Sequence, residues 1–286
     1  FQCTTFLNKH ANAFTYLYES AILREREGGF IMKLVNKHIV ITGGTTGIGF
    51  QLAKHLLEAG NKVLVVDYSE QNINEALKKE PSLQTLQADL SNPEERVELV
   101  GKLEEVFPEY DVFVNNAGIQ RWINLQNADK DWSFYHQELA INFEAPMHLS
   151  MLTLNHLLTK KEAAIVNVSS GLVINPGAWV PLYTSGKTGL HGFTEALRLQ
   201  LQDTAVDVFE IFPPAVNTEL GGSTEHAYGV AVDEFIPAVL AQIEADQFHV
   251  TYGTSKEQFN ASKEVNQQTT QNTWEMFKEN PTFLNA

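Results

Sequence analysis

Short apolar runs alternate with longer amphipathic segments over most of the chain. The runs are four to six residues long, and most do not alternate with polar residues, which is typical of strands buried on both faces of a parallel sheet. We predict seven strands, at His38–Thr42, Val63–Asp67, Leu83–Ala88, Val112–Asn115, Ala164–Val168, Val206–Ile211 and His249–Tyr252. Helix-sized segments separate them, near residues 47–59, 70–79, 93–107, 131–159, 183–203 and 232–245. This order predicts the α/β class, with a single doubly wound domain, a mostly parallel seven-stranded sheet and helices on both faces.

The two ends of the chain lack this alternation. Residues 1–31 carry no function-bearing pattern and none of the features of a secretory signal. Arg26–Gly29 could be encoded by a purine-rich run like a bacterial ribosome-binding site, so we expect a translated leader and a native start at Met32. A genuine N-terminal extension is the alternative. We expect the folded domain to cover residues 32–253 and a helical tail to cover residues 254–286.

The composition excludes several classes of protein. With 43% hydrophobic residues, the 286-residue chain can bury a full core, which excludes intrinsic disorder. The 35 acidic and 20 basic side chains give a net charge of −15, so we expect no nucleic-acid partner and no anionic membrane partner. The single cysteine, Cys3, excludes a disulfide framework and a cysteine-clustered zinc site. Because the longest apolar runs are too short to span a membrane, we predict a cytoplasmic protein.

The first predicted strand leads into a glycine-rich turn, Thr42-Gly43-Gly44-Thr45-Thr46-Gly47-Ile48-Gly49. Glycines let the backbone turn sharply and approach a pyrophosphate, which the free N–H groups of a helix N-terminus bind. Asp67 ends the next strand, where a carboxylate accepts hydrogen bonds from adenosine ribose hydroxyls and repels a 2′-phosphate. The turn contains no Lys or Arg, and Tyr68 follows Asp67, so the pattern predicts a dinucleotide site that prefers NAD to NADP. A simple tight turn and a solvated aspartate are the alternatives.

A second group of residues indicates acid–base chemistry. Tyr183 and Lys187 are four residues apart, which places them on one helix face. A phenol ionises at about pH 10, and a nearby cation stabilises the phenolate and lowers the phenol pKa. Ser169 and Ser170 follow a predicted strand, at the sheet edge where ligands bind. Because a Tyr-x-x-x-Lys pair also occurs on solvated helix faces, its meaning depends on the serine and the glycine turn.

Asn142 lies four residues before Pro146. In a helix the N–H of residue i+4 normally bonds the carbonyl of residue i, and proline has no N–H. The Asn142 carbonyl is therefore predicted to lose its helical partner and to need another. A helix kink that serves packing alone is the alternative.

Taken in order, these motifs resemble the classical short-chain dehydrogenase/reductase family over residues 34 to about 253. The signatures are Thr42-Gly43-x-x-x-Gly47-x-Gly49, Asn115-Asn116-Ala117-Gly118, Asn142, Ser170, Tyr183-x-x-x-Lys187, and Pro213-Pro214-Ala215-Val216-Asn217-Thr218 where the family has Pro-Gly-x-x-x-Thr. The resemblance implies a Rossmann domain whose catalytic residues are Asn142, Ser170, Tyr183 and Lys187. Tyr183 would be the general acid/base, Lys187 would lower its pKa and bind the nicotinamide ribose, and Ser170 would polarise the carbonyl. The Asn142 carbonyl would hold a water linked to the lysine.

The same resemblance implies a set of cofactor contacts. We expect NAD to be held by Gly43, Thr45, Thr46, Gly47, Ile48, Gly49, Asp67, Asp89, Leu90, Asn116, Ala117, Gly118, Tyr183, Lys187, Val216 and Thr218. Asp89 would meet the adenine, and Asn116 and Gly118 would line the adenosine side. Val216 and Thr218 would hold the carboxamide.

The substrate side is less determined by the sequence. Pro214 replaces the usual glycine of the family, which would stiffen the chain beside the nicotinamide and alter how the loop near residues 220–229 closes. Trp122, Trp179 and Leu172–Ile174 suggest an apolar pocket, although exposed aromatic side chains equally form subunit interfaces. We predict structural roles and no metal site for the helical histidines His136, His148 and His191.

We predict an NAD(H)-dependent oxidoreductase that transfers a hydride between nicotinamide and a secondary alcohol or ketone, a small-molecule substrate. Two alternatives are a nicotinamide-dependent isomerase or dehydratase on the same scaffold and a non-catalytic dinucleotide-sensing protein. The pattern is also similar to bacterial oxidoreductases whose genes accompany D-alanylation of teichoic acids. The resemblance implies a homodimer or homotetramer, paired through the helices that follow the fourth and fifth strands.

Overall fold

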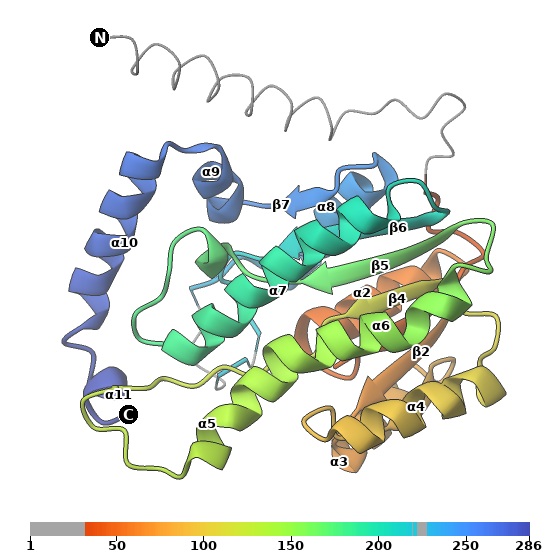
Figure 1. Ribbon diagram of the computed structural model, residues 1–286, viewed down its shortest axis with the longest axis horizontal. Coiled ribbons are helices and arrows are strands. Elements are labelled where there is room, and N and C mark those ends of the chain that lie inside the picture. The colour runs from red at the N-terminus through yellow and green to blue at the C-terminus, as the bar shows by residue number, and fades with distance from the viewer. Residues whose placement is uncertain (1–31, 219, 222–227) are drawn as a thin grey trace, which may run out of the picture. The chain divides into compact units, whose positions relative to one another are not determined.

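A seven-stranded sheet, all of its strands parallel, organises the protein (Figure 1). The computed structural model describes residues 32–218, 220–221 and 228–286. The strands are β1 (His38–Thr42), β2 (Lys62–Asp67), β3 (Gln84–Gln87), β4 (Val112–Asn115), β5 (Ala163–Val168), β6 (Val206–Phe212) and β7 (His249–Thr251). Their order is β3-β2-β1-β4-β5-β6-β7, so the direction of winding reverses between β1 and β4. The predicted doubly wound α/β fold is confirmed, and the predicted leader, residues 1–31, lies outside the described residues.

Helices cover both faces of the sheet (Figure 1). They are α2 (Gly47–Glu58), α3 (Glu70–Lys79), α4 (Pro93–Val106), α5 (Trp132–Leu139), α6 (Ala145–Leu157), α7 (Pro181–Leu201), α8 (Val232–Glu244), α9 (Thr254–Asn260), α10 (Lys263–Phe277) and α11 (Pro281–Leu284), with a short 3₁₀ turn, η2 (Gly171–Val173), after β5. Helices α4, α6 and α7 pack over one face, and α2 and α8 pack together over the other. None of the helices in the described residues is long and apolar enough to cross a membrane.

The apolar core follows from the alternation of side chains along each strand. Val40, Phe113 and Ile165 point to the same face and join one buried cluster with Leu149 of α6 and Leu197 of α7. The neighbouring strand residues point to the opposite face, toward α2 and α8. Because β4 and β5 are buried along their whole length, their sequences are continuously apolar or amide-bearing, as parallel central strands require.

The single helix predicted over residues 131–159 is interrupted. Between α5 and α6 the chain forms a π-helical turn, η1 (Ala140–Glu144), in which the Ala145 N–H bonds the Ala140 carbonyl. Pro146 lies in the first turn of α6 and has no N–H to give to the Asn142 carbonyl, so the wider turn forms here. The predicted disturbance of the helix at Asn142 is therefore present as a π turn.

The C-terminal helices return to the carboxyl end of the sheet (Figure 1). The Ser255 hydroxyl of α9 donates to the Phe212 carbonyl at 2.6 Å. The Asn175 Nδ2 donates to the Asn266 carbonyl of α10 at 2.9 Å. The tail is thus tied to the loops that follow β5 and β6, which are the loops nearest a ligand site in this fold. The predicted division at residue 253 stays a prediction.

Candidate active site

A cavity of about 780 Å³ opens at the carboxyl ends of the strands. Ligands of open α/β sheets bind where the strand order reverses, here between β1 and β4. The predicted site residues that line it are Gly43, Thr46, Gly47, Ile48, Asp67, Asp89, Leu90, Asn116, Ala117, Gly118, Ser170, Tyr183, Lys187, Val216 and Thr218. Three others, Thr45, Gly49 and Asn142, lie behind these lining residues rather than on the cavity surface.

The glycine-rich turn is held against the end of β4. Gly43 has a φ of +60°, in the left-handed region that favours glycine. The Asn116 Nδ2 donates to the carbonyl oxygens of Thr42 and Gly43, each at 3.0 Å. A Cβ atom on Gly49 would lie 2.2 Å from the Gly43 carbonyl oxygen, so a side chain does not fit there. Gly49 therefore supports the turn from behind, and Asn116 fixes its position.

Asp67 is nearly buried at the end of β2. One carboxylate oxygen accepts the Ser69 N–H at 2.9 Å, and the other accepts the Thr45 hydroxyl. Tyr68 beside it is 70% exposed and lines the cavity. Thr45, a predicted cofactor contact, is thus directed at the carboxylate and orients it.

Two further loops complete the cavity on the predicted cofactor side. The Asp89 carboxylate accepts the Ser91 N–H at 2.9 Å, which turns it back onto its own chain. The Thr218 side chain lies 3.4 Å from the position a Cβ would have at Gly47, so the loop after β6 reaches the glycine turn. The predicted loop near residues 220–229 is described only at residues 220–221 and 228–229.

Ser170, Tyr183 and Lys187 converge on the cavity, with exposed fractions of 8%, 6% and 3%. Ser170 and Tyr183 share a side-chain hydrogen bond. The Lys187 Nζ donates to the Val168 carbonyl at 2.8 Å. Ser169 is directed elsewhere, because its hydroxyl donates to a backbone carbonyl of β6 at 3.2 Å. Tyr183 is thus paired with Ser170, the serine that the family resemblance implies, and not with Ser169.

Asn142 is fully buried on the π turn behind this group. Its side chain bonds both backbone groups of Ile119, accepting the N–H at 3.0 Å and donating to the carbonyl at 2.7 Å. A Cβ on Gly118 would lie 2.9 Å from the Asn142 Oδ1 and 3.5 Å from the Lys187 Nζ. Asn142 therefore fixes the loop after β4 close to the lysine.

The motifs, their order and this geometry agree with comparison to known proteins. The family model described as short chain dehydrogenase matches residues 37–229. The chain belongs to the short-chain dehydrogenase family. The predicted membership is confirmed, and with it an oxidoreductase on a Rossmann fold.

Individual relatives fit this assignment. The oxidoreductase DltE of Bacillus subtilis (strain 168) is 42% identical over 199 residues, which cover 70% of this chain and 79% of DltE. A crystal structure of a short-chain dehydrogenase/reductase from Burkholderia phymatum in complex with NAD matches with a TM-score of 0.70 at 18% identity, covering 77% of this chain and 90% of that one. Another, from Burkholderia cenocepacia J2315 in complex with NADP, matches with a TM-score of 0.72 at 21% identity and covers 84% and 99%.

Burial opposes the ionisation of both members of the dehydrogenase's Tyr–Lys pair. Burial raises the pKa of Tyr183 to about 12, while its hydrogen bond with Ser170 acts in the opposite direction. Burial lowers the pKa of Lys187 to about 8, against the effect of the negative Glu210. The surroundings of the site thus disfavour both the Tyr183 phenolate and the Lys187 ammonium. Charged side chains nearby therefore have a strong effect on the ionisation of both groups.

Glu138 does not line the cavity, but its charge acts on Tyr183 and its position was not predicted from the sequence. It lies on α5, is fully buried, and accepts the Arg121 N–H at 3.2 Å through one oxygen. Its other oxygen has no hydrogen-bond partner among the described residues. Burial raises the pKa of Glu138 to about 7, and the charge of Glu138 raises the pKa of Tyr183. No local pattern distinguishes it from other helical glutamates, because its burial depends on the packing of α5 against α7.

The predicted apolar pocket is present in part and is backed by the C-terminal tail: Leu172 lines the cavity, whereas Val173 and Ile174 do not. Trp122 and Trp179 line the cavity. Phe277 of α10 stacks on Trp179, with ring centroids 4.1 Å apart, and lies 5.4 Å from the Trp122 ring. Phe283 of α11 belongs to the same cluster, which also contains Tyr183. The sequence allowed either a pocket or a subunit interface for the two tryptophans. In the structure the tail packs against both of them.

Proposed function

We propose that this short-chain dehydrogenase is an NAD(H)-dependent oxidoreductase that interconverts a secondary alcohol and a ketone. The observation that carries the proposal is the convergence of Ser170, Tyr183 and Lys187 on a cavity whose other end is formed by the glycine turn. A proton donor, a cation and a hydroxyl at one point suit the reduction of a carbonyl group.

The residues present fit a nicotinamide dinucleotide. The glycine turn gives a ligand close access to the N-terminus of α2, where backbone N–H groups bind phosphate. The Asp67 carboxylate lines the cavity and is a suitable acceptor for ribose hydroxyls. When bound, the nicotinamide supplies or accepts the hydride.

Charge favours NAD(H) over NADP(H). Asp67 would repel a 2′-phosphate, and Tyr68 beside it is uncharged. Among the described residues that line the cavity, the Lys and Arg side chains are Lys187 and Arg121. The Arg121 guanidinium donates to the carbonyl of Phe134, and Lys187 belongs to the catalytic group.

The proposed proton transfer uses Tyr183. In reduction, its hydroxyl gives a proton to the carbonyl oxygen while the carbonyl carbon receives the hydride, and in oxidation the proton returns. Ser170, bonded to the same phenol, orients the substrate oxygen. Lys187 stabilises the phenolate through its positive charge.

A fluorescence titration with NADH and with NADPH, followed by a carbonyl panel, tests the proposal. We expect tighter binding of NADH, and tighter binding of NADPH would overturn the role of Asp67. Tyr183→Phe should bind NADH normally but lose at least about 100-fold in rate, and retention of most activity would refute the assignment. Conversion without net consumption of NADH would favour the isomerase or dehydratase alternative. Binding with no conversion of any substrate would favour the sensor.

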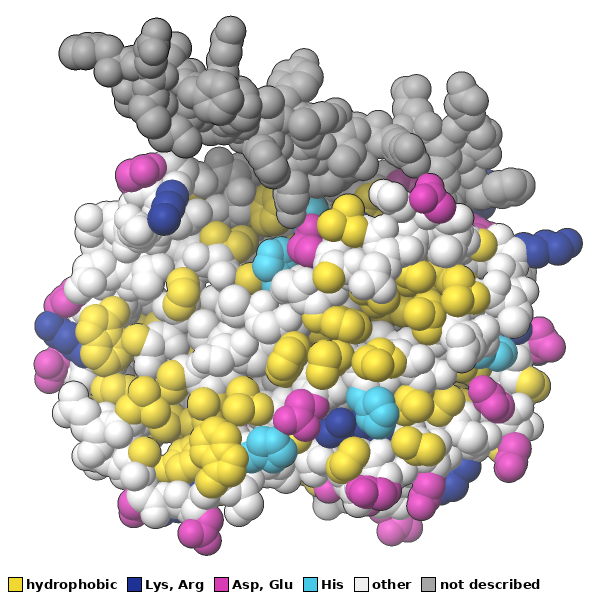
Figure 2. Space-filling model, viewed as in Figure 1, with side chains coloured by type: hydrophobic (Ala, Val, Ile, Leu, Met, Phe, Trp, Pro, Cys, Tyr) yellow, Lys and Arg dark blue, Asp and Glu magenta, His cyan; other side chains and the backbone are white. Residues whose placement is uncertain are grey.

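We also propose a cytoplasmic homodimer or homotetramer. Figure 2 shows apolar side chains gathered over α6 and α7, which face the viewer. Trp132, Met151 and Leu199, on α5, α6 and α7, are 64%, 63% and 60% exposed. Such a patch is typical of an association surface, and the single cysteine of the chain fits a reducing compartment. Analytical ultracentrifugation of Met151→Glu and Leu199→Glu tests the association, which these charges should weaken.

A further inference from the structure

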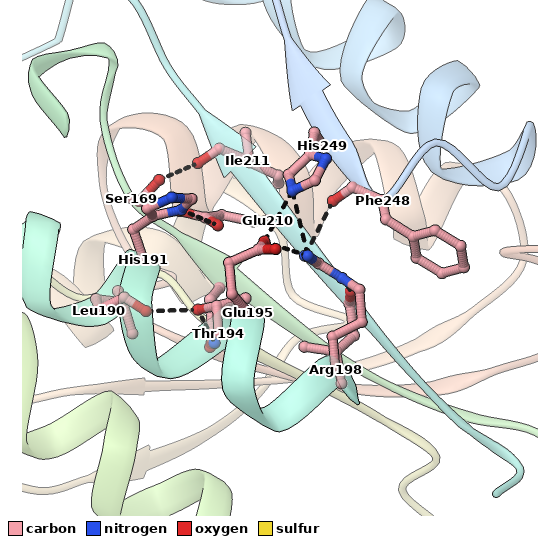
Figure 3. A network of polar contacts seen from close by, with 12 residues as sticks. Ser169, Leu190, His191, Thr194, Glu195, Arg198, Glu210, Ile211, Phe248 and His249 are labelled. Atoms are coloured by element: carbon pink, nitrogen blue, oxygen red, sulfur yellow. Dashed lines mark hydrogen bonds and ion pairs between the residues drawn. The ribbon is translucent and has the colours of Figure 1, made fainter. Parts of the chain in front are cut away.

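A buried carboxylate on β6 lies behind the catalytic pair. Glu210 is fully buried, and Figure 3 shows it directed at His191 of α7. The His191 Nδ1 donates to the Glu210 Oε2 at 2.9 Å. The second oxygen, Oε1, has no hydrogen-bond partner among the described residues. A buried, half-paired carboxylate is costly to the fold, so its presence calls for a function beyond packing.

The geometry connects Glu210 to Lys187. Lys187 and His191 are four residues apart on α7 and share one helix face. In the sheet, Glu210 lies in register with Asn167, the residue before Val168, whose carbonyl accepts the Lys187 Nζ at 2.8 Å. The Lys187 Nζ therefore bonds the backbone of β5 one residue beyond the position that pairs with Glu210 of β6.

We propose that Glu210 is a positioning residue for the reaction: its carboxylate holds Lys187 in the ammonium form from behind the sheet edge, and His191 links this carboxylate to solvent. The inference rests on the proposed function, in which Lys187 must be charged. Glu210 raises the pKa of Lys187 and so opposes the effect of burial. The His191 side chain is 33% exposed, and its protonation would compensate the charge of Glu210 and weaken the support of Lys187.

The other charged groups of this region form a separate outer part of the network. In Figure 3, Glu195 of α7 is directed at Arg198 and His249; it is ion-paired with Arg198 and hydrogen-bonded to the His249 Nε2. His191, Glu195 and Glu210 offer side-chain atoms within 4.8 Å of one another. Because Arg198 and His249 already pair with Glu195, we interpret the cluster as an ion-pair network. The groups that face Lys187 and His191 are Tyr183, Glu195 and Arg198 on α7, and Glu210 on β6, while Glu138 of α5 acts on Tyr183.

The decisive measurement is the titration of the Lys187 side chain in the full chain, by NMR of its ¹³Cε signal, which Lys187→Met identifies. Glu210→Gln keeps the shape of the side chain and removes its charge. We expect this variant to lower the Lys187 midpoint by about one pH unit or more. The pH at which kcat/KM falls on the alkaline side should be lower in the variant than in the wild-type protein by the same amount as the Lys187 midpoint. A midpoint that moves by less than about 0.3 pH unit would refute the inference.

Two matched variants separate the effect from a general loss of charge or of structure. Glu195→Gln removes a charge from the outer part of the same network and should leave the Lys187 midpoint in place, so an equal drop would overturn the inference. His191→Gln keeps a donor for Glu210 and should leave the midpoint at or above the wild-type value, and a drop would again overturn it. If Glu210→Gln does not fold, a drop of the Lys187 midpoint in His191→Gln still overturns the inference.

The two proposals fail in different ways. The NMR titration needs no substrate, so absence of turnover in the wild-type protein refutes the proposed function alone. Normal turnover with an unmoved Lys187 midpoint in Glu210→Gln refutes the role of Glu210 alone.

Discussion

Glu138→Gln should make the stability of the protein less dependent on pH. The wild-type carboxyl is fully buried, bonds the Arg121 N–H through one oxygen, and leaves the other without a partner among the described residues. Glutamine keeps the acceptor for Arg121 and cannot ionise, so the substitution isolates the cost of placing a charge at this position.

The sign and size follow from the pKa of the two states. Burial raises the pKa of Glu138 from 4.5 to about 7 in the folded protein. Below about pH 4.5 the carboxyl is protonated in both states, so the folded state carries no penalty. As the pH rises toward about 7, the unfolded chain loses its proton first and the folded state loses stability. The gap between 4.5 and about 7, at about 1.4 kcal/mol per unit, corresponds to a full loss of about 3 kcal/mol.

Urea unfolding of the two proteins at about pH 5 and about pH 8 measures this effect. The free energy of unfolding of Glu138→Gln relative to wild type should rise by about 2 to 3 kcal/mol between the two pH values. Glu98→Gln is the control, because that carboxylate is 66% exposed and its removal should change the pH dependence by less than about 0.5 kcal/mol. An equally small change in Glu138→Gln would refute the reasoning, since the buried carboxyl would then ionise as it does in water.

Three further substitutions test the site. Gly49→Ala places a Cβ against the Gly43 carbonyl, so it should lower the free energy of unfolding by about 1 to 3 kcal/mol and weaken NADH binding. Gly101→Ala, in open space on α4, is the control and should change neither. A thermal melt and an NADH titration compare the two variants. Asp67→Ser should lower NADH affinity by about tenfold relative to NADPH, and an unchanged ratio in parallel titrations would contradict the role of this carboxylate. Phe277→Ala removes the ring stacked on Trp179 and should lower the free energy of unfolding, measured in urea, by about 1 kcal/mol. It should also raise KM more than it changes kcat, because Trp179 lines the cavity. Equal changes in KM and kcat would contradict a role of Phe277 in supporting the substrate pocket.

The strands and most helices could be predicted because their signals are local. Continuous apolar runs placed β1 and β4 with the observed bounds, since a central parallel strand is apolar on both faces. Asn142 and Pro146 predicted a disturbed helix, because the missing N–H is a property of one residue. The form of the disturbance, a π turn, depends on how α6 packs, and the sequence did not show it. The edge strand β3 is shorter than predicted, and its half-exposed side chains explain the weaker pattern.

The residues that were missed act through contacts distant in the sequence. Glu138 and Glu210 look like ordinary surface-type glutamates along the chain, and both are fully buried once α7 packs against α5 and β6. Phe277 sits on a helix with a mixed polar pattern, and only the return of α10 to the cavity gives it a role. Thr45 and Gly49 were assigned to the cofactor by their motif, yet they support Asp67 and the turn from behind.

The two buried glutamates act in opposite directions on Tyr183 and Lys187, the proposed catalytic pair. Burial is the largest cause of both shifts, and with the neighbouring charges included the pKa of Tyr183 is raised to about 12 and that of Lys187 is lowered to about 8, so on raising the pH the lysine loses its charge before the tyrosine ionises. A neutral lysine cannot stabilise the phenolate, and the acid–base step of the proposed reaction would lose its support. The charge of Glu210 opposes the loss at Lys187, whereas an ionised Glu138 adds to the difficulty at Tyr183. The arrangement that best serves the step is therefore a charged Glu210 with a protonated Glu138, and the burial of Glu138, which raises its pKa, maintains that arrangement toward neutral pH.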